Sequence, residues 1–300
     1  MSNITNKIIN SFMDKSNSLN LDWQKNLDND GYLIIENSDY MKNNLISLRD
    51  EATKLIEKEG DKGGWEGKEK YFKPGKRFES GAQRLGGLVN KHEVFLGLIT
   101  VPEILICAHH IIKEQIKICG MNLRNPLKNL GEQTIHFDGF PRKSISEPYA
   151  GIVAFIYLDD SKIDNGAMRV VPGTHKLIGW PDDHIDINEK HPKEIRLEVK
   201  AGAIVIANLN LWHAGAKNIN GDPRKVIMLN IKNREHDQLL NYKKYLDQNF
   251  IQNLNQNEKY LLAVREEDPD QIVDSGGSAN QLRREHFKNK NKKFTSVANN

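Results

Sequence analysis

The sequence predicts a mainly β protein with flanking helices, built around a double-stranded β-helix, the jelly-roll core of cupin-like proteins. Between residues 152 and 231, short apolar runs alternate with turns that contain glycine and proline, a pattern typical of a sandwich or barrel. His136 and His213 lie on separate predicted strands, and a jelly roll would bring these strands together. The expected core strands are Ile152 to Leu158, Met168 to Val171, Glu194 to Val199, Ala203 to Ala207 and Val226 to Ile231.

A further strand and two helices are expected before this core, and two shorter helices after it. Each upstream helix has apolar residues spaced for one helical face, and the second of them ends at a glycine, a common helix stop. In the strand 194–199, apolar and charged residues alternate, which predicts a half-exposed strand. The expected ranges are 31–35 for the upstream strand, 40–59 and 102–120 for the upstream helices, and 239–245 and 254–265 for the later ones.

Length and composition favour one compact domain. A chain of 300 residues with 38% hydrophobic content can bury a sizeable core. We expect a polar N-terminal arm at residues 1–20, a single domain at 21–265 with its core at about 131–231, and a polar, basic tail at 266–300. The tail is interpreted as a solubilising segment, with a patch for nucleic acid or an acidic partner as the alternative.

The charge balance excludes no small-molecule chemistry but gives no general attraction to nucleic acid or membranes. There are 43 basic and 40 acidic residues, for a net charge of +3. The glycine-, lysine- and glutamate-rich stretch 60–77 is predicted to be a long solvated loop, and the alternative is a lid over an anionic substrate.

Two cysteines, Cys107 and Cys119, lie in an apolar stretch and are interpreted as buried thiols rather than a disulfide. The N-terminus has no segment with the parts of a signal peptide, and no stretch is apolar enough for a membrane span. A cytoplasmic protein with a small-molecule substrate, and neither nucleic acid nor membrane as a partner, is therefore expected.

The most informative motif is His136-Phe137-Asp138, combined with a distant second histidine. A histidine and a carboxylate two positions apart on a strand point to the same face, so both can reach one metal ion. His213 would complete a triad of two imidazoles and one carboxylate. This ligand set leaves open positions that suit non-haem Fe(II), although zinc and manganese also accept such ligands.

Arg224 follows His213 at the point where the next antiparallel strand would begin. Its planar guanidinium could clamp one end of a dicarboxylate whose other end chelates the metal. The alternative is a surface arginine at the end of the turn 220–223.

Several segments around these residues resemble the phytanoyl-CoA dioxygenase family of Fe(II)- and 2-oxoglutarate-dependent oxygenases. The likeness is specific from residue 131 to residue 231, and it is weaker upstream, at 30–35, 84–89 and 102–105. No resemblance is seen beyond Arg234. The matching segments are 133–138 (Gln-Thr-Ile-His-Phe-Asp), the apolar strand 152–158, 164–175 (Asp-Asn-Gly-Ala-Met-Arg-Val-Val-Pro-Gly-Thr-His), 201–206 and 211–215 (Leu-Trp-His-Ala-Gly).

The resemblance implies that His136, Asp138 and His213 hold Fe(II) and that Arg224 anchors 2-oxoglutarate. The co-substrates would be 2-oxoglutarate and O2, with oxidative decarboxylation to succinate coupled to oxidation of a substrate carbon. Halogenating relatives lack the carboxylate ligand, so the presence of Asp138 implies hydroxylation.

Other residues near the motif are weaker candidates. Gln133 could bind 2-oxoglutarate or orient the metal ligands, and a plain sheet-edge amide is the alternative. Arg142 and Lys143 could meet an anionic substrate at the mouth of the pocket, and a solvated loop is the alternative. Thr174 and His175 are interpreted as fixing a turn rather than binding metal.

Two other functions compete with the hydroxylase. One is a cupin-like metalloenzyme that does not use 2-oxoglutarate, in which Arg224 would have no anchoring role. The other is a non-catalytic jelly-roll binding protein, which would have no need of two histidines, an aspartate and an arginine together.

Overall fold

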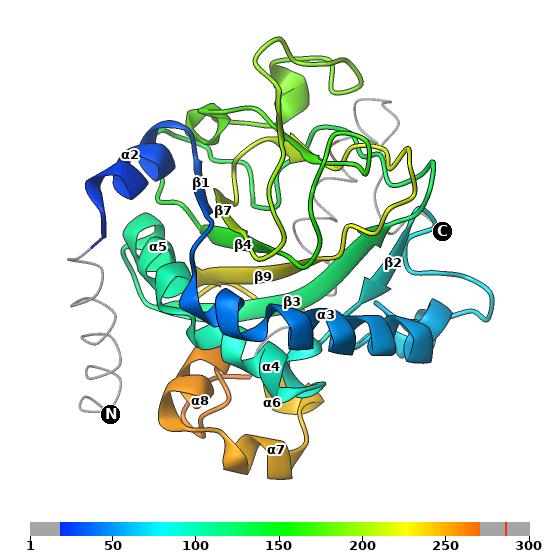
Figure 1. The fold of residues 1–300 in the computed structure, drawn as a ribbon. Coiled ribbons are helices and arrows are strands. Elements are labelled where there is room, and N and C mark those ends of the chain that lie inside the picture. Colours follow the sequence, from blue (N-terminus) through cyan, green and yellow to red (C-terminus); the bar gives the residue numbers. More distant parts are fainter. Residues whose placement is uncertain (1–18, 271–285, 287–300) are drawn as a thin grey trace.

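A computed structural model describes residues 19–270 and residue 286. Two antiparallel sheets face each other, with most helices on the outer side of the larger sheet, so the predicted mainly β jelly-roll class is confirmed (Figure 1). The larger sheet has the order β1-β7-β4-β9-β3-β2, and the smaller has the order β6-β5-β8. The strands are β1 (Tyr32–Ile35), β2 (Ala82–Leu85), β3 (Ile116–Pro126), β4 (Gly151–Tyr157), β5 (Met168–Val170), β6 (Ile195–Leu197), β7 (Ile204–Asn208), β8 (His213–Ala214) and β9 (Val226–Asn233).

The helices cover the outer face of the large sheet. Side chains of α3, α5 and α8 share one apolar core with the outward-facing residues Ile227, Leu229 and Ile231 of β9. The long helix α3 runs across the sheet, as Figure 1 shows. The helices are α2 (Leu21–Asn29), α3 (Asp39–Glu59), α4 (Glu93–Leu96), α5 (Pro102–Ile112), α6 (Tyr242–Tyr245), α7 (Gln248–Asn253) and α8 (Gln256–Leu262).

The space between the two sheets holds a second, smaller core. Val226 and Met228 of β9 belong to it, and so do Val153, Phe155 and Tyr157 of β4. Successive residues of a strand point to opposite faces, so β9 contributes its even-numbered side chains to this inner space and its odd-numbered ones to the helix-packed core.

The predicted helix 102–120 is wrong in its second half. Helix α5 ends at Ile112, because Lys113 adopts a left-handed conformation with a φ of 57°. The chain then enters β3, whose Ile116 and Ile118 are β-branched and pair with β9. The apolar spacing fitted a helix, but pairing with a central strand decides the structure.

The other predicted strands are present, with ends that differ by one or two residues. The half-exposed strand expected at 194–199 is shorter, at Ile195–Leu197, and of its two isoleucine and leucine side chains Leu197 is buried and Ile195 is 40% exposed. Of the later helices, α6 covers only Tyr242–Tyr245, and α8 covers Gln256–Leu262.

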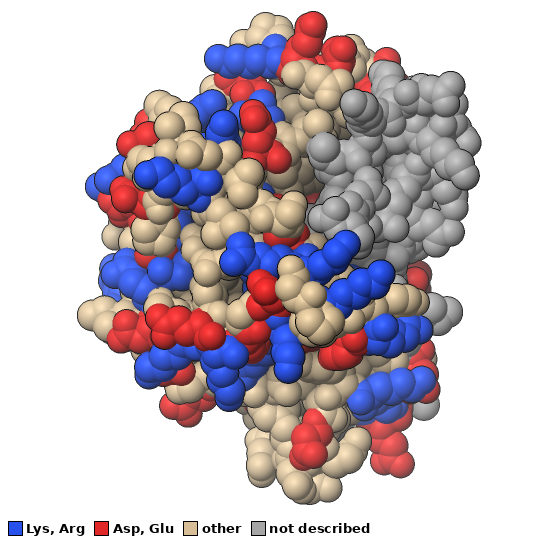
Figure 2. Space-filling view, turned by 90° about the vertical axis from the view of Figure 1, so that its right-hand side faces the viewer, with Lys and Arg blue, Asp and Glu red and all other residues tan. Residues whose placement is uncertain are grey.

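Residues 60–77 contain two short 3-10 turns, Gly60–Lys62 and Glu69–Tyr71, within an otherwise irregular loop. Its charges are partly paired, since Arg77 bonds Asp61, and Lys91 bridges Glu66 and Glu59. Acidic and basic side chains are interspersed over the face drawn in Figure 2, in keeping with the near balance of the two in the sequence.

Cys107 and Cys119 are buried and unbonded, as expected. Among the described residues, no single helix has the length and apolar character of a membrane span. The bent pair Glu93–Thr100 and Pro102–Ile112 meets both criteria when its two helices are taken together. The polar arm at 1–20 and the basic tail at 266–300 fall largely outside the described residues.

Candidate metal centre and active site

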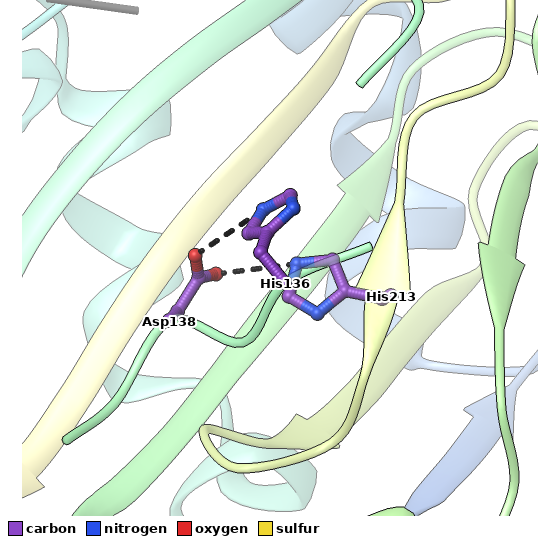
Figure 3. A group of neighbouring side chains, drawn as sticks. All are labelled: His136, Asp138 and His213. Carbon is purple, nitrogen blue, oxygen red and sulfur yellow. Dashed lines mark ion pairs between the residues drawn. The ribbon is translucent and has the colours of Figure 1, made fainter. Parts of the chain in front are cut away.

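Three predicted ligand side chains meet in the inner space (Figure 3). His136 Nε2 lies 3.8 Å from Asp138 Oδ1, and His213 Nε2 lies 3.5 Å from Asp138 Oδ2. The centroids of the two imidazole rings are 4.6 Å apart. Residues separated by more than seventy positions therefore converge on one point, as the sequence predicted.

The backbone that holds these ligands is less regular than expected. His136 forms an isolated antiparallel bridge with His213, in which each amide N–H donates to the other residue's carbonyl, at 2.9 and 2.7 Å. Asp138 is fixed separately, because its amide N–H donates to the carbonyl of Leu209 at 2.9 Å. The prediction that His136 and Asp138 lie on one regular strand is wrong, but the bridge gives the same convergence.

The histidine tautomers are set by neighbouring carbonyl groups. His136 Nδ1 lies 2.8 Å from the carbonyl oxygen of Thr134, and His213 Nδ1 lies 2.9 Å from that of Leu211. A ring nitrogen facing a carbonyl carries the proton, so each Nε2 keeps its lone pair and points toward the carboxylate. The three ligand atoms lie within 4.8 Å of one another, and this donor set fits a divalent transition metal.

Phe137 points away from the ligands and anchors the motif. It packs with Ile135 and Trp212 in a small apolar cluster and stacks on Trp180 at a centroid distance of 5.3 Å. Thr174 secures the other ligand segment, because its hydroxyl donates to the carbonyl of Val171 and accepts from the amide of Trp212. The turn role expected for Thr174 is thus visible in its contacts.

Arg224 is buried at the far end of the inner space, just before β9. Its Nε has no hydrogen-bond partner within the part of the chain that the structure describes, and the hydroxyl of Tyr157 lies beside the guanidinium. Burial lowers the pKa of Arg224 to about 10, although Tyr157 and Glu79 favour the charged form. A buried guanidinium with an unsatisfied donor is costly unless a ligand completes its hydrogen bonds.

Two arginines that sequence reasoning missed stand beside Arg224. Arg124 of β3 grips Glu79 with its Nε and Nη2, at 3.1 and 2.6 Å, and Arg84 of β2 lies 3.7 Å from the same carboxylate. Burial lowers the pKa of Arg84, while Glu79 and Asp138 oppose that shift, so Arg84 also lies within the electrostatic reach of a metal ligand. Arg84, Arg124, Arg224 and Glu79 thus form a buried wall of the inner space. The wall contains three guanidinium groups and one carboxylate.

Gln133 holds the segment that carries His213. Its side-chain oxygen accepts from the backbone N–H of Gly215 at 3.0 Å, and its backbone N–H donates to the carbonyl of Gly215 at 2.9 Å. The carbonyl of Gln133 in turn accepts from Arg169. These bonds agree with a role in orienting the ligands, and the contact with 2-oxoglutarate stays a prediction.

Arg142 and Lys143 are arranged differently from one another. The guanidinium of Arg142 is buried and donates to the backbone carbonyls of Ile145, Glu147 and His175. Lys143 is exposed, and its amide donates to the carboxylate of Glu147. Arg142 thus joins its own loop to the segment of His175, the contact of Lys143 stays within the loop, and an interaction of either residue with substrate stays a prediction.

Comparison with solved structures supports the fold. HygX from Streptomyces hygroscopicus, crystallised with nickel and 2-oxoglutarate, has a TM-score of 0.57 and 16% identity, over 73% of this chain and 89% of HygX. Iron-bound EctD from S. alaskensis has a TM-score of 0.58 and 15% identity, over 73% and 79% of the two chains. SnoK, a non-heme alpha ketoglutarate dependent carbocyclase from nogalamycin biosynthesis, has a TM-score of 0.54 and 18% identity, over 73% and 86%.

Sequence comparison adds the family. The uncharacterized protein Rv1501 of Mycobacterium tuberculosis is 27% identical over 171 residues, and Mb1539 of Mycobacterium bovis matches equally. These matches cover 54% of this chain and 58% of each relative, so less than two thirds of the relatives' length is represented. The family model for phytanoyl-CoA dioxygenase (PhyH) matches residues 27–226, two thirds of the chain. The protein therefore belongs to the phytanoyl-CoA dioxygenase family.

Proposed function

We propose that this protein is an Fe(II)- and 2-oxoglutarate-dependent dioxygenase that hydroxylates a small, anionic organic substrate and converts 2-oxoglutarate to succinate. The observation that carries the proposal is the arrangement of His136, Asp138 and His213, whose ligand atoms lie within 4.8 Å of one another. Two imidazoles and one carboxylate on one side of a metal leave positions for a chelating co-substrate and oxygen.

Arg224 is assigned to the far carboxylate of 2-oxoglutarate. Its unsatisfied Nε could donate to a carboxylate oxygen, and Tyr157 offers a hydroxyl beside it. The charges of the wall support a dianion, because Arg84, Arg124 and Arg224 together exceed Glu79 by two positive charges. A co-substrate with two carboxylates would neutralise that excess in a site where uncompensated charge is expensive.

Bound iron and 2-oxoglutarate supply the oxidising chemistry, and the chain supplies position and shelter. The bonds from His136 and His213 to backbone carbonyls keep both Nε2 atoms unprotonated and aimed at one point. Phe155 packs edge-on against His213, at a centroid distance of 5.7 Å, and belongs to the apolar inner core that limits access of water.

The competing functions account for fewer of these features. A cupin-like metalloenzyme without 2-oxoglutarate would use the metal ligands but leave the buried Nε of Arg224 without a task. A binding protein would need neither the defined tautomers nor a buried excess of guanidinium groups.

An anaerobic titration with Fe(II) and 2-oxoglutarate tests the proposal. We expect a visible metal-to-keto-acid charge-transfer band that requires both additions. Arg224→Met should raise the 2-oxoglutarate concentration needed for the band at least about tenfold, because a charge-assisted pair is lost.

Arg196→Met, on the exposed side of β6, is the matched control and should leave the titration unchanged. Metal binding without a band would favour the cupin-like enzyme, and absence of metal binding would favour a binding protein.

A further inference from the structure

The inner face of β9 carries a second buried cation at the end opposite Arg224. Lys232 is separated from Arg224 by eight positions, so the two side chains share a face and stand roughly 26 Å apart along an extended chain. The metal ligands lie between these levels, because Phe155, which packs on His213, pairs with Met228 in the middle of β9. Along the inner space, Arg224 therefore lies at one end, Lys232 lies at the other, and the predicted metal ligands lie between them.

Lys232 is linked to the turn that carries Asp138 through the backbones of Gly151 and Leu209. It pairs with Gly151 of β4, whose carbonyl accepts from the amide of Leu209 at 3.1 Å. The carbonyl of Leu209 accepts in turn from the amides of Asp138 and Gly139. The ammonium of Lys232 lies 5.8 Å from the ring centroid of Phe140, two residues beyond the metal ligand.

The ammonium of Lys232 is not matched by an acid. The residue is 6% exposed, and within residues 19–270 it makes neither an ion pair nor a side-chain hydrogen bond. A lysine with so little exposed surface is stabilised when an anion or hydrogen-bond acceptors lie beside its ammonium. The contact of Lys232 with the face of Phe140 supplies only part of such stabilisation.

A second lysine strengthens the positive character of this end. Lys117 of β3 is the direct cross-strand partner of Lys232 and is 1% exposed. Like charges at directly opposed positions destabilise a sheet, so an anion beside Lys232 would be favourable. Asp237 acts on Lys117 and partly offsets its charge.

His236 adds no further positive charge at neutral pH. It stacks on Phe140 at a centroid distance of 6.2 Å, on a segment that folds back past the start of β3. Burial lowers its pKa, and the charges of Lys232 and Lys117 lower it further. The imidazole therefore lies beside Phe140 as a flat, neutral group.

We propose that Lys232, supported by Lys117, binds a carboxylate or phosphonate group of the organic substrate. The inference rests on the proposed function and deepens it, since it names the charged group that the substrate carries and where that group binds. With 2-oxoglutarate held at Arg224, the substrate's anion at Lys232 would set one of its carbon atoms toward the metal. This site is distinct from Arg142, whose guanidinium is taken up by backbone carbonyls.

Nuclear relaxation by the paramagnetic iron tests this directly. Protein loaded anaerobically with Fe(II) and saturating 2-oxoglutarate is titrated with methylphosphonate, observed by ³¹P, or with ¹³C-acetate, and acetamide serves as the neutral counterpart. We expect saturable relaxation with at least one anion and none with acetamide. Lys232→Met should weaken that anion's binding at least about tenfold, because it keeps the aliphatic stem and removes the charge.

Lys200→Met, at an exposed lysine paired with Asp160, is the matched control and should bind the anion as the wild type does. The two anions distinguish a carboxylate substrate from a phosphonate one. Equal relaxation in Lys232→Met, as direct ligation of the anion to iron would give, overturns the proposal. So does a wild type without saturable relaxation while its charge-transfer band is present; loss of the band itself would instead count against the proposed function.

A melting curve distinguishes a structural role of Lys232 from a role in substrate binding. Removal of a buried, unmatched charge should leave the melting temperature unchanged or raise it. A large drop for Lys232→Met, combined with restored stability but no anion binding in Lys232→Arg, would show that the cation serves the fold and would refute the substrate role.

Discussion

The two faces of β9 differ in what they contribute to the molecule. On the outer face, Ile227, Leu229 and Ile231 are fully buried among the helices. On the inner face, Met228 and Asn230 are only partly buried, and the charged Lys232 follows them. The apolar face gains stability from packing, whereas the inner face gives up part of that gain to hold charged groups around the metal ligands.

The same division appears across the sheet. Strands buried on both faces usually read as continuous apolar runs. β4 follows that pattern throughout, but β9 and β3 interrupt it with Lys232, Lys117 and Arg124. A charged residue inside such a strand therefore identifies the wall of a site, provided that its side faces the inner space.

His213→Ala should give the largest effect of any single change on the inner side. It removes one of three ligands, and we expect metal affinity to fall by more than about a hundredfold, with loss of 2-oxoglutarate turnover. The fold should remain, because the backbone bridge to His136 does not use the imidazole. Isothermal titration with Fe(II) and a melting curve measure the two quantities.

His191→Ala serves as the control, since His191 is a partly exposed histidine that also contacts Trp212. A variant at His213 that binds Fe(II) as tightly as this control would refute the assignment of the metal site.

Leu229→Ala should have the opposite effects: it should lower the free energy of unfolding and leave the affinity for Fe(II) and 2-oxoglutarate nearly unchanged. Leu229 has no exposed surface, and truncation of a fully buried leucine costs about 2–5 kcal/mol of unfolding free energy. The neighbouring Met228→Ala should cost less, because Met228 is only partly buried and faces the inner space. Urea unfolding of both variants provides the measurement.

The folded fraction of Leu229→Ala should still bind Fe(II) and 2-oxoglutarate with near wild-type affinity. Equal destabilisation by Leu229→Ala and Met228→Ala would mean that packing on the outer face of β9 does not stabilise the protein more than packing on the inner face.

The sequence was sufficient for the fold class and for the convergence of the three expected ligands, and the reason is physical. Apolar runs bounded by glycine and proline turns carry the strand pattern locally, and His136, Asp138 and His213 form a ligand set with a definite chemistry. The regular strand expected around His136 was wrong, because a single bridge to His213 is enough to align the ligands.

What the sequence could not show depends on long-range pairing. Arg84 and Arg124 are cross-strand partners forty residues apart, and nothing local to either position reveals that both face Glu79. The isoleucines at the start of β3 continue the apolar spacing of α5, so the local pattern predicts helix where the structure has a strand. Lys232 was overlooked for a simpler reason, since the predicted strand ended one residue before it.

The smallest expected effect comes from substitution of His175. It tests whether the loss of folding stability in acid comes from this buried histidine rather than from groups on the inner face of β9. It lies under the turn before β1, where a Cβ on Gly31 would come within 2.4 Å of the imidazole, and the φ of Gly31 is 81°. Burial lowers the pKa of His175 to about 4, and the charge of Lys176 contributes to the shift. The folded protein therefore holds this imidazole neutral.

Because an unfolded histidine has a pKa of about 6.5, the unfolded chain binds more protons below that pH. The stability that His175 contributes is present above about pH 6.5 and is lost as the pH falls toward 4, by on the order of 1–2 kcal/mol at pH 5. Metal-free His175→Gln should lose correspondingly less stability than the wild type between pH 7 and pH 5, as measured by urea midpoints. The exposed His184→Gln should behave as the wild type, and an equal acid response in all three proteins would show that His175 is not the source of the acid sensitivity.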